Sequence, residues 1–184
     1  MSYTPMHDGE EQGLFDITRT LLQQPDLCAL AHALTLHVRQ QRLADRVSIV
    51  LWRAGRERVS FYSADEQGTP SVREEDALLA TGPLRRTLSR PDALHCPWPT
   101  FRETWPQIDA LGLYPPFAHY ALLPLAADGD IFGGCEVVRS DDTPWSEAAF
   151  SRLQSLAQVI GLAVEQIQSR LSNNSSYSLL CRER

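Results

Sequence analysis

Lysine is absent from this chain of 184 residues, so all 17 of its basic side chains are arginine. The arginines are scattered, and the formal net charge is −6, whereas a nucleic-acid-binding surface needs clustered positive charge. Long apolar runs are also missing, since none approaches the roughly 20 residues that cross a bilayer. The polar, acidic residues 1–12 do not form a signal peptide. We therefore expect no contact with nucleic acid, no membrane segment and a cytoplasmic location.

Cysteine is scarce, and the four cysteines are far apart, at Cys28, Cys96, Cys135 and Cys181. No CxxC motif is present, so the spacing favours free thiols in a reducing compartment over a disulfide framework. Cys28 and His32 stand four residues apart on a predicted helix and form a possible metal half-site. No second pair has ligand spacing, so we expect neither a metal nor another cofactor.

The chain does contain a clear alternation of helical and strand patterns. The expected order begins with two amphipathic helices (14–22, and 27–38 capped by Asp26), a hairpin (47–52 and 59–62 around 54–57), a polar loop (65–76) and a short helix (77–89). A segment rich in proline and tryptophan follows (91–116), with a short strand near 95–96 and a weak helical pattern at 101–111. A second hairpin (120–125 and 131–138, with the turn Asp128-Gly129) and a long terminal helix complete the chain. This order predicts an α+β fold with a central antiparallel sheet. The terminal helices would cover one face, and short helices and loops would cover a pocket on the other.

The terminal helix carries an apolar seam at intervals of three and four residues. Thr143 is predicted as its N-cap and Pro144 as its first helical residue. The seam consists of Phe150, Leu153, Ala157, Ile160, Val164, Ile167 and Leu171. No glycine or proline ends the helix, so we expect it to form a homodimer contact and to carry a signal to a following domain.

Seven short segments resemble the N-terminal GAF domain of the formate hydrogenlyase transcriptional activators, a family of bacterial enhancer-binding proteins. They are residues 13–27 (GLFDITRTLLQQPDL), 88–92 (LSRPD), 94–96 (LHC), 103–107 (ETWPQ), 131–136 (IFGGCE), 144–147 (PWSE) and 179–184 (LLCRER). GAF domains are sensor modules related in shape to PAS domains. The resemblance spans nearly the whole chain and implies a flexible N-terminus (1–12), a GAF domain (13–171) and the start of a linker (172–184).

The same resemblance implies a function and partners. Proteins of that family carry tandem GAF domains, a central AAA+ ATPase and a helix-turn-helix, and they work with the nitrogen-type sigma factor when formate accumulates. This chain has no GxxxxGK phosphate loop and no DNA-reading module, so it resembles the first sensor domain alone. The implied effector is formate, and the implied partners are the second GAF domain and the ATPase.

A formate site needs a guanidinium fork inside a small cavity. Arg85 and Arg86 on the predicted short helix are candidates, although two solvated surface arginines would give the same pattern. His95 and Cys96 would lie on a strand returning toward the pocket. A structural histidine is the alternative for His95.

Four further residues are candidates for the pocket wall. Trp105, like Trp98 and Tyr114, is more typical of a packing residue than of an aromatic cage that binds a ligand. His119 and Tyr120 begin a strand and must point to opposite faces, so one of them faces the pocket. Glu136 stands in an apolar strand and needs a partner, for which an arginine is the natural choice.

Two other functions compete with a small-molecule sensor. One is an interaction module whose pocket is collapsed and whose helix only dimerises the activator. The other is a GAF-type enzyme or tetrapyrrole binder using Cys96. Adjacent strand residues face apart, so His95 cannot readily serve Cys96 as a base, and we expect no enzymatic activity.

Overall fold

A six-stranded sheet forms the centre of the computed structural model, which describes residues 16–52, 58–75, 82–111 and 117–180. The strand order is β3-β2-β1-β6-β5-β4, and every neighbouring pair is antiparallel. The strands are β1 (Arg46–Trp52), β2 (Val59–Ala64), β3 (Pro70–Glu75), β4 (Leu94–Pro97), β5 (His119–Ala127) and β6 (Asp130–Arg139). The helices are α2 (Leu27–Gln40), α4 (Pro83–Ser89), α5 (Trp98–Thr104), α6 (Pro106–Ala110) and α7 (Glu147–Leu180), with a further helix over 16–22.

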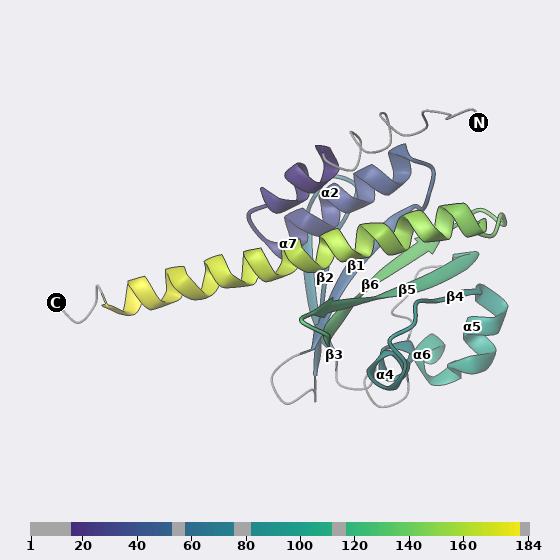
Figure 1. Ribbon diagram of the computed structural model, residues 1–184. Helices are drawn as coiled ribbons and strands as arrows, with labels where there is room; N and C mark the ends of the chain where they lie inside the picture. The colour runs from purple at the N-terminus through teal and green to yellow at the C-terminus, as the bar shows by residue number, and fades with distance from the viewer. Residues whose placement is uncertain (1–15, 53–57, 76–81, 112–116, 181–184) are drawn as a thin grey trace, which may run out of the picture.

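The helices form two layers, one on each face of the sheet (Figure 1). Helix α2 packs on β1, β2 and β3, while α7 packs on β5. On the opposite face, α4 contacts β5 and β6, and α5 contacts β4 and β5. The predicted α+β arrangement is therefore confirmed, including the placement of long helices on one face and short ones on the other.

Local sequence signals account for the start of α2 and its attachment to the sheet. Asp26 caps the helix, since its carboxylate accepts a hydrogen bond from the Ala29 amide at 2.8 Å. The buried Thr35 hydroxyl accepts from the Val47 amide at 3.1 Å. This bond satisfies a polar group inside an apolar layer, where an unpaired group would be costly.

The β5–β6 hairpin closes through a two-residue turn, as predicted from Asp128-Gly129. Both residues have positive φ, 50° and 87°, which matches the twist of hairpin strands. A bulge follows at Leu125/Ala126, and beyond it Gly133 lies so close to the Val50 carbonyl oxygen that no Cβ would fit. Glycine at that position is a packing requirement.

Three predicted boundaries differ from the structure. The polar loop at 65–76 contains the edge strand β3, whose residues are almost all exposed and so carry no apolar alternation. The short helix begins at Pro83, and the weak pattern at 101–111 is two helices separated at Pro106. Residues 54–57 and 76–81 of the predicted elements lie outside the described part of the chain.

The predicted cap of α7 is also wrong. The Thr143 amide donates to the Asp141 carboxylate at 2.9 Å, which makes a turn ahead of the helix. The helix begins at Glu147, and the Ser146 side chain accepts from the Ala149 amide at 3.2 Å. Ser146 is therefore the N-cap, three residues later than expected.

The apolar seam of α7 lies inside the domain. Five of its seven residues are no more than 6% exposed and pack against the sheet and α2: Leu153, Ala157, Ile160, Val164 and Ile167. Phe150 packs at the edge of this core, and Leu171 is 49% exposed. Packing within one chain accounts for the buried part of the seam, so these five residues give no evidence for a dimer, and the expected homodimer stays a prediction.

Helix α7 continues past the sheet and projects from the domain (Figure 1). It runs through Leu180, so residues that the sequence assigned to a linker are helical as far as that point. Near the edge of the domain, the Arg170 guanidinium donates to the Gln24 carbonyl oxygen. No helix among the described residues is long and apolar enough to cross a membrane.

Burial of the seam predicts that its loss destabilises the fold. Ile160 is 1% exposed and Leu162, two residues away, is 60% exposed. Replacing Ile160 with Ala should lower the free energy of unfolding by about 2–5 kcal/mol, whereas Leu162→Ala should change it by less than about 0.5 kcal/mol. Urea denaturation followed by circular dichroism measures both. Equal effects in the two variants would contradict the placement of the seam.

Candidate functional site

Aromatic side chains fill much of the face beneath α4, α5 and α6. Phe101 is fully buried, and its ring centroid lies 4.8 Å from that of Tyr120, 5.3 Å from that of Trp98 and 5.2 Å from that of Trp105. Trp98 and Trp105 therefore act as packing, as the sequence favoured. Tyr114 lies outside the described residues.

A buried tyrosine–glutamate pair stands on this same face. Tyr120 is 0% exposed and Glu136 is 3% exposed, and the tyrosine hydroxyl donates to the Glu136 carboxylate at 2.6 Å. The short distance is typical of a charge-assisted O–H···O bond. Sequence reasoning expected an arginine partner for Glu136 and did not choose between His119 and Tyr120. The structure places Tyr120 on the pocket side.

Beside Glu136, a small polar cavity of about 10 Å³ opens on the sheet, a volume that holds roughly one water molecule. Its walls are Arg46, Ser48, Phe61, Ser63, Arg73, Glu75 and Glu136. The strand register puts these residues on one sheet face, since Ser48 pairs with Glu136 and Arg73 with Phe61. We call this the polar cavity. It combines two guanidinium groups with two carboxylates.

Sequence reasoning missed the two arginines of the polar cavity. Arg73 lay in a predicted loop, so no strand periodicity was assigned to it. Arg46 begins β1, where Arg46 and Ser48 alternate with the buried Val47 and Ile49. That alternation is the signal that could have placed Arg46 and Ser48 on the pocket face.

The two arginines on α4 differ in position. Arg85 is exposed, whereas Arg86 is half-buried and lies close enough to Cys96 to act on its charge. Burial raises the pKa of the Cys96 thiol to about 11, and the Arg86 charge opposes this only in part. Of the two candidates, Arg86 is thus the one directed toward the protein interior.

The two candidate histidines lie on the other face. His95 packs against Phe150 of α7, with ring centroids 4.4 Å apart and the ring planes tilted by 51°. His119 lies beside Trp145 and its Nε2 is 3.2 Å from the Asp142 carbonyl oxygen. Cys96 is in register with Tyr120 and shares its face. The structure therefore separates both histidines from Cys96.

The possible half-site on α2 is arranged for packing. The Cys28 thiol faces the Ser71 carbonyl oxygen at 3.8 Å, and the His32 ring packs against Gly68. Within the described ranges, no three histidine, cysteine or acidic side chains are grouped as a metal would require. Cys28, Cys96 and Cys135 are buried and free.

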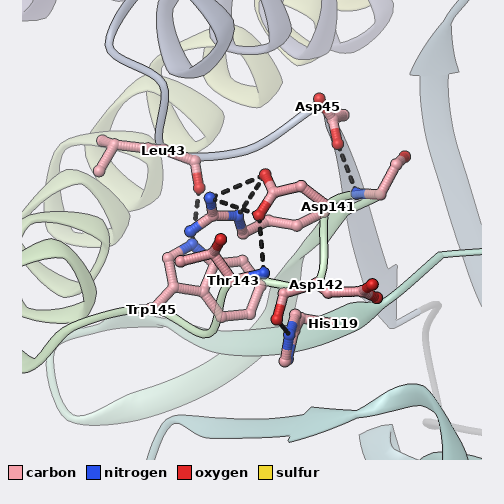
Figure 2. A network of polar contacts seen from close by, with 9 residues as sticks. Leu43, Asp45, His119, Asp141, Asp142, Thr143 and Trp145 are labelled. Atoms are coloured by element: carbon pink, nitrogen blue, oxygen red, sulfur yellow. Dashed lines mark hydrogen bonds and ion pairs between the residues drawn. The ribbon is translucent and has the colours of Figure 1, made fainter.

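A second polar cluster, which we call the clamp, fixes the segment leading into α7 (Figure 2). The buried Trp145 indole donates to the Leu43 carbonyl oxygen at 2.6 Å, and the Arg139 guanidinium donates to the Asp141 carboxylate at 2.8 Å. The Arg139 guanidinium also lies over the Trp145 ring, 5.8 Å from its centroid. The clamp thereby joins the end of β6, the loop before β1 and the start of α7.

No family model matches the chain, but individual proteins do. It is 59% identical over all 184 residues to the formate hydrogenlyase transcriptional activator FhlA of Escherichia coli (strain K12). It is 58% identical over the same length to the formate hydrogenlyase transcriptional activator of Salmonella typhimurium (strain SL1344). In both cases, the chain spans 27% of the relative's length.

Solved structures of low sequence identity share the architecture. The GAF domain from an Acinetobacter phosphoenolpyruvate-protein phosphotransferase superimposes with a TM-score of 0.68 at 15% identity, covering 89% of this chain and 97% of that one. Such a likeness concerns the fold alone. It confirms the fold predicted from the sequence.

The raised pKa of Cys96 predicts that its thiol reacts slowly with alkylating reagents. With a pKa of about 11, only about one thiol in a thousand is ionised at pH 8, and the thiolate is the nucleophile. Iodoacetamide should therefore label Cys96 in the native protein far more slowly than free cysteine in the same buffer, and denaturation should remove the difference. Labelling of native Cys96 at the rate of free cysteine would argue for a reactive site.

The Tyr120–Glu136 hydrogen bond predicts that removing the tyrosine hydroxyl lowers the free energy of unfolding. Tyr120→Phe leaves the buried carboxylate without this donor and should destabilise the fold by about 1.5–3 kcal/mol. Tyr62→Phe is the control, because Tyr62 is half-buried on the opposite side of β2 and has no hydroxyl bond among the described residues. Urea denaturation compares the two. A Tyr120→Phe variant as stable as the control would mean that the bond contributes nothing.

Proposed function

Starting from a GAF domain that matches the N-terminal part of the formate hydrogenlyase transcriptional activators, we propose that this chain senses formate for such an activator. The observation that carries the proposal is identity over the whole chain at 59%. The role is regulatory rather than enzymatic. In the longer protein, a second GAF domain and an AAA+ ATPase would receive the signal through α7, and other domains would contact DNA.

The polar cavity supports a site for the smallest carboxylate. Arg46 and Arg73 line it from β1 and β3, and Ser48 adds a hydroxyl from β1. A guanidinium fork matches the two oxygens of a carboxylate, which a single ammonium does not. The site we propose is therefore on the sheet itself, and Arg85, which points to solvent, is not part of it.

The size of the cavity supports selection of formate over larger acids. Its volume of about 10 Å³ holds about one water molecule, so even formate needs Glu75 to leave the cavity, and an extra methyl group would need a further wall to move. Phe61 and Ser48 are only 7% and 8% exposed, so these walls are held by the surrounding core. Acetate should consequently bind much more weakly than formate.

The carboxylates already present in the polar cavity determine how an anion could bind there. The cavity already holds the carboxylates of Glu75 and Glu136 beside its two arginines. Glu136 is buried and bonded to Tyr120, whereas Glu75 ends the edge strand and is half-buried. Glu75 is the wall residue that can turn toward water, and formate would take its place beside the arginines.

This arrangement predicts opposite effects for two kinds of substitution. Arg46→Gln and Arg73→Gln should each weaken formate binding about ten- to a hundredfold, the effect of losing a charge-assisted pair. Glu75→Gln removes a competing carboxylate and should tighten binding. Arg85→Gln is the matched control and should leave the affinity unchanged. Titration calorimetry of the chain with formate measures all four, with acetate as a second ligand.

Two outcomes would contradict the proposal at different levels. If formate binds but Arg85→Gln weakens it while the cavity variants do not, the site lies on the roof helix. If the folded wild-type protein binds no formate, the sensor proposal fails. The filled aromatic face would then favour an interaction module that makes protein contacts only.

A further inference from the structure

The clamp lies on the same two strands as the buried Tyr120–Glu136 pair. Tyr120 and Glu136 point to the pocket face of β5 and β6, while His119 and Arg139, at the paired ends of these strands, hold the segment that enters α7. His119 and Arg139 are directly opposite each other in the register. A shift of this end of the hairpin would therefore move both groups at once.

The clamp combines one buried hydrogen bond, from Trp145 to Leu43, with contacts nearer the surface around Arg139 and Asp141. Trp145 is 6% exposed, and the Arg139 side chain is 13% exposed. The Arg139 hydrogen bonds hold the pKa of the Asp141 carboxyl below its usual value, and the same carboxylate accepts from the Thr143 amide. A charge-assisted, bidentate pair of this kind fixes orientation as well as distance.

The clamp also reaches the loop between α2 and β1. The Ser140 amide donates to the Asp45 carboxylate, and the Asp45 amide donates to the Val138 carbonyl oxygen at 2.9 Å. Together with the bond from Trp145 to Leu43, these contacts attach the start of α7 to that loop as well as to the end of β6. The clamp therefore fixes the segment just before α7, while Phe150 in the first turn packs on His95 and the edge of the core.

We propose that the clamp is the coupling element of the domain, through which a change at the Tyr120–Glu136 pair alters the seating of the first turn of α7. The inference deepens the proposed sensor function and rests on it for the identity of the signal. Arg139, Asp141 and Trp145 are positioning residues here, since they touch neither the polar cavity nor its ligand. Coupling of this kind requires an element that both ends bias, and the proposal assigns this role to the clamp.

A double-mutant cycle in the 184-residue chain tests the coupling without any ligand. Tyr120→Phe should change the hydrogen exchange of the amides at 147–152 severalfold. In an Asp141→Asn or Trp145→Phe background, the same substitution should change it less than about twofold, because the connection is broken. Asp142→Asn is the matched control: its side chain is exposed and uses no clamp bond, so the full effect of Tyr120→Phe should remain.

The outcomes are distinct. An effect of Tyr120→Phe on α7 that is equal in all backgrounds, or absent in all of them, would overturn the inference. Trp145→Phe could fail to fold, but Asp141 is 54% exposed, so Asp141→Asn keeps the test available. Circular dichroism checks the fold of each variant.

A formate experiment separates this inference from the proposed function. Clamp variants should bind formate with wild-type affinity, since the clamp lies outside the cavity, yet formate should no longer change the exchange of the α7 amides. Loss of binding in the clamp variants would contradict the inference. If wild-type protein binds no formate, the sensor proposal fails, and the double-mutant cycle still decides whether the clamp couples the two faces.

Discussion

The register of the β5–β6 hairpin determines the position of almost every group that could act in this domain. Side chains alternate between the two faces of a sheet, so a slip of one residue would exchange the pocket face for the helix face. Tyr120 and Glu136 would then lie under α7. The turn at Asp128 and Gly129, both with positive φ, holds the register at one end. The bulge at Leu125/Ala126 adjusts it before the strands reach the core.

The same register sets how closely the short-helix layer approaches the sheet. Gly134 lies opposite Pro124 and beneath Leu84 of α4, and a Cβ at this position would meet Leu122 at 2.7 Å and Leu84 at 3.4 Å. A side chain there would displace Leu122 of β5, while Leu84 of α4 already lies at contact distance. The short-helix layer therefore rests directly on the sheet at this point, and the polar cavity is a small space nearer β3.

Sequence patterns predicted most of the fold because apolar residues recur at regular helical or strand spacing in most of its elements. Asp26 identified the start of α2, and the Asp-Gly turn identified the second hairpin. The edge strand β3 was missed because one edge of it faces solvent and its side chains are polar, so no buried face imposes an alternation. The cap of α7 was misplaced because Thr143 and Ser146 both carry suitable hydroxyls, and only tertiary contacts choose between them.

The candidate site was less predictable, since it depends on which strands become neighbours. Arg46 and Arg73 are 27 positions apart in the sequence and meet Glu136 only because β1 separates β2 from β6. Sequence reasoning placed the arginines of the site on a helix, whereas the arginines that line the cavity with Glu136 come from the sheet. Hydrophobic periodicity and composition predict which residues are buried, but they do not predict which polar side chains a sheet brings together.

The length of α7 turns a local change into a large one. At about 1.5 Å per residue, its 34 residues form a rod of about 51 Å. A tilt of only about 5° at its first turn would displace the far end by about 4 Å, close to the rise of three helical residues. Under the proposed sensor function, α7 would act as a lever whose near end is held by the Trp145 indole. Movements too small to matter within the packed core would then become larger displacements at the end that projects from the domain.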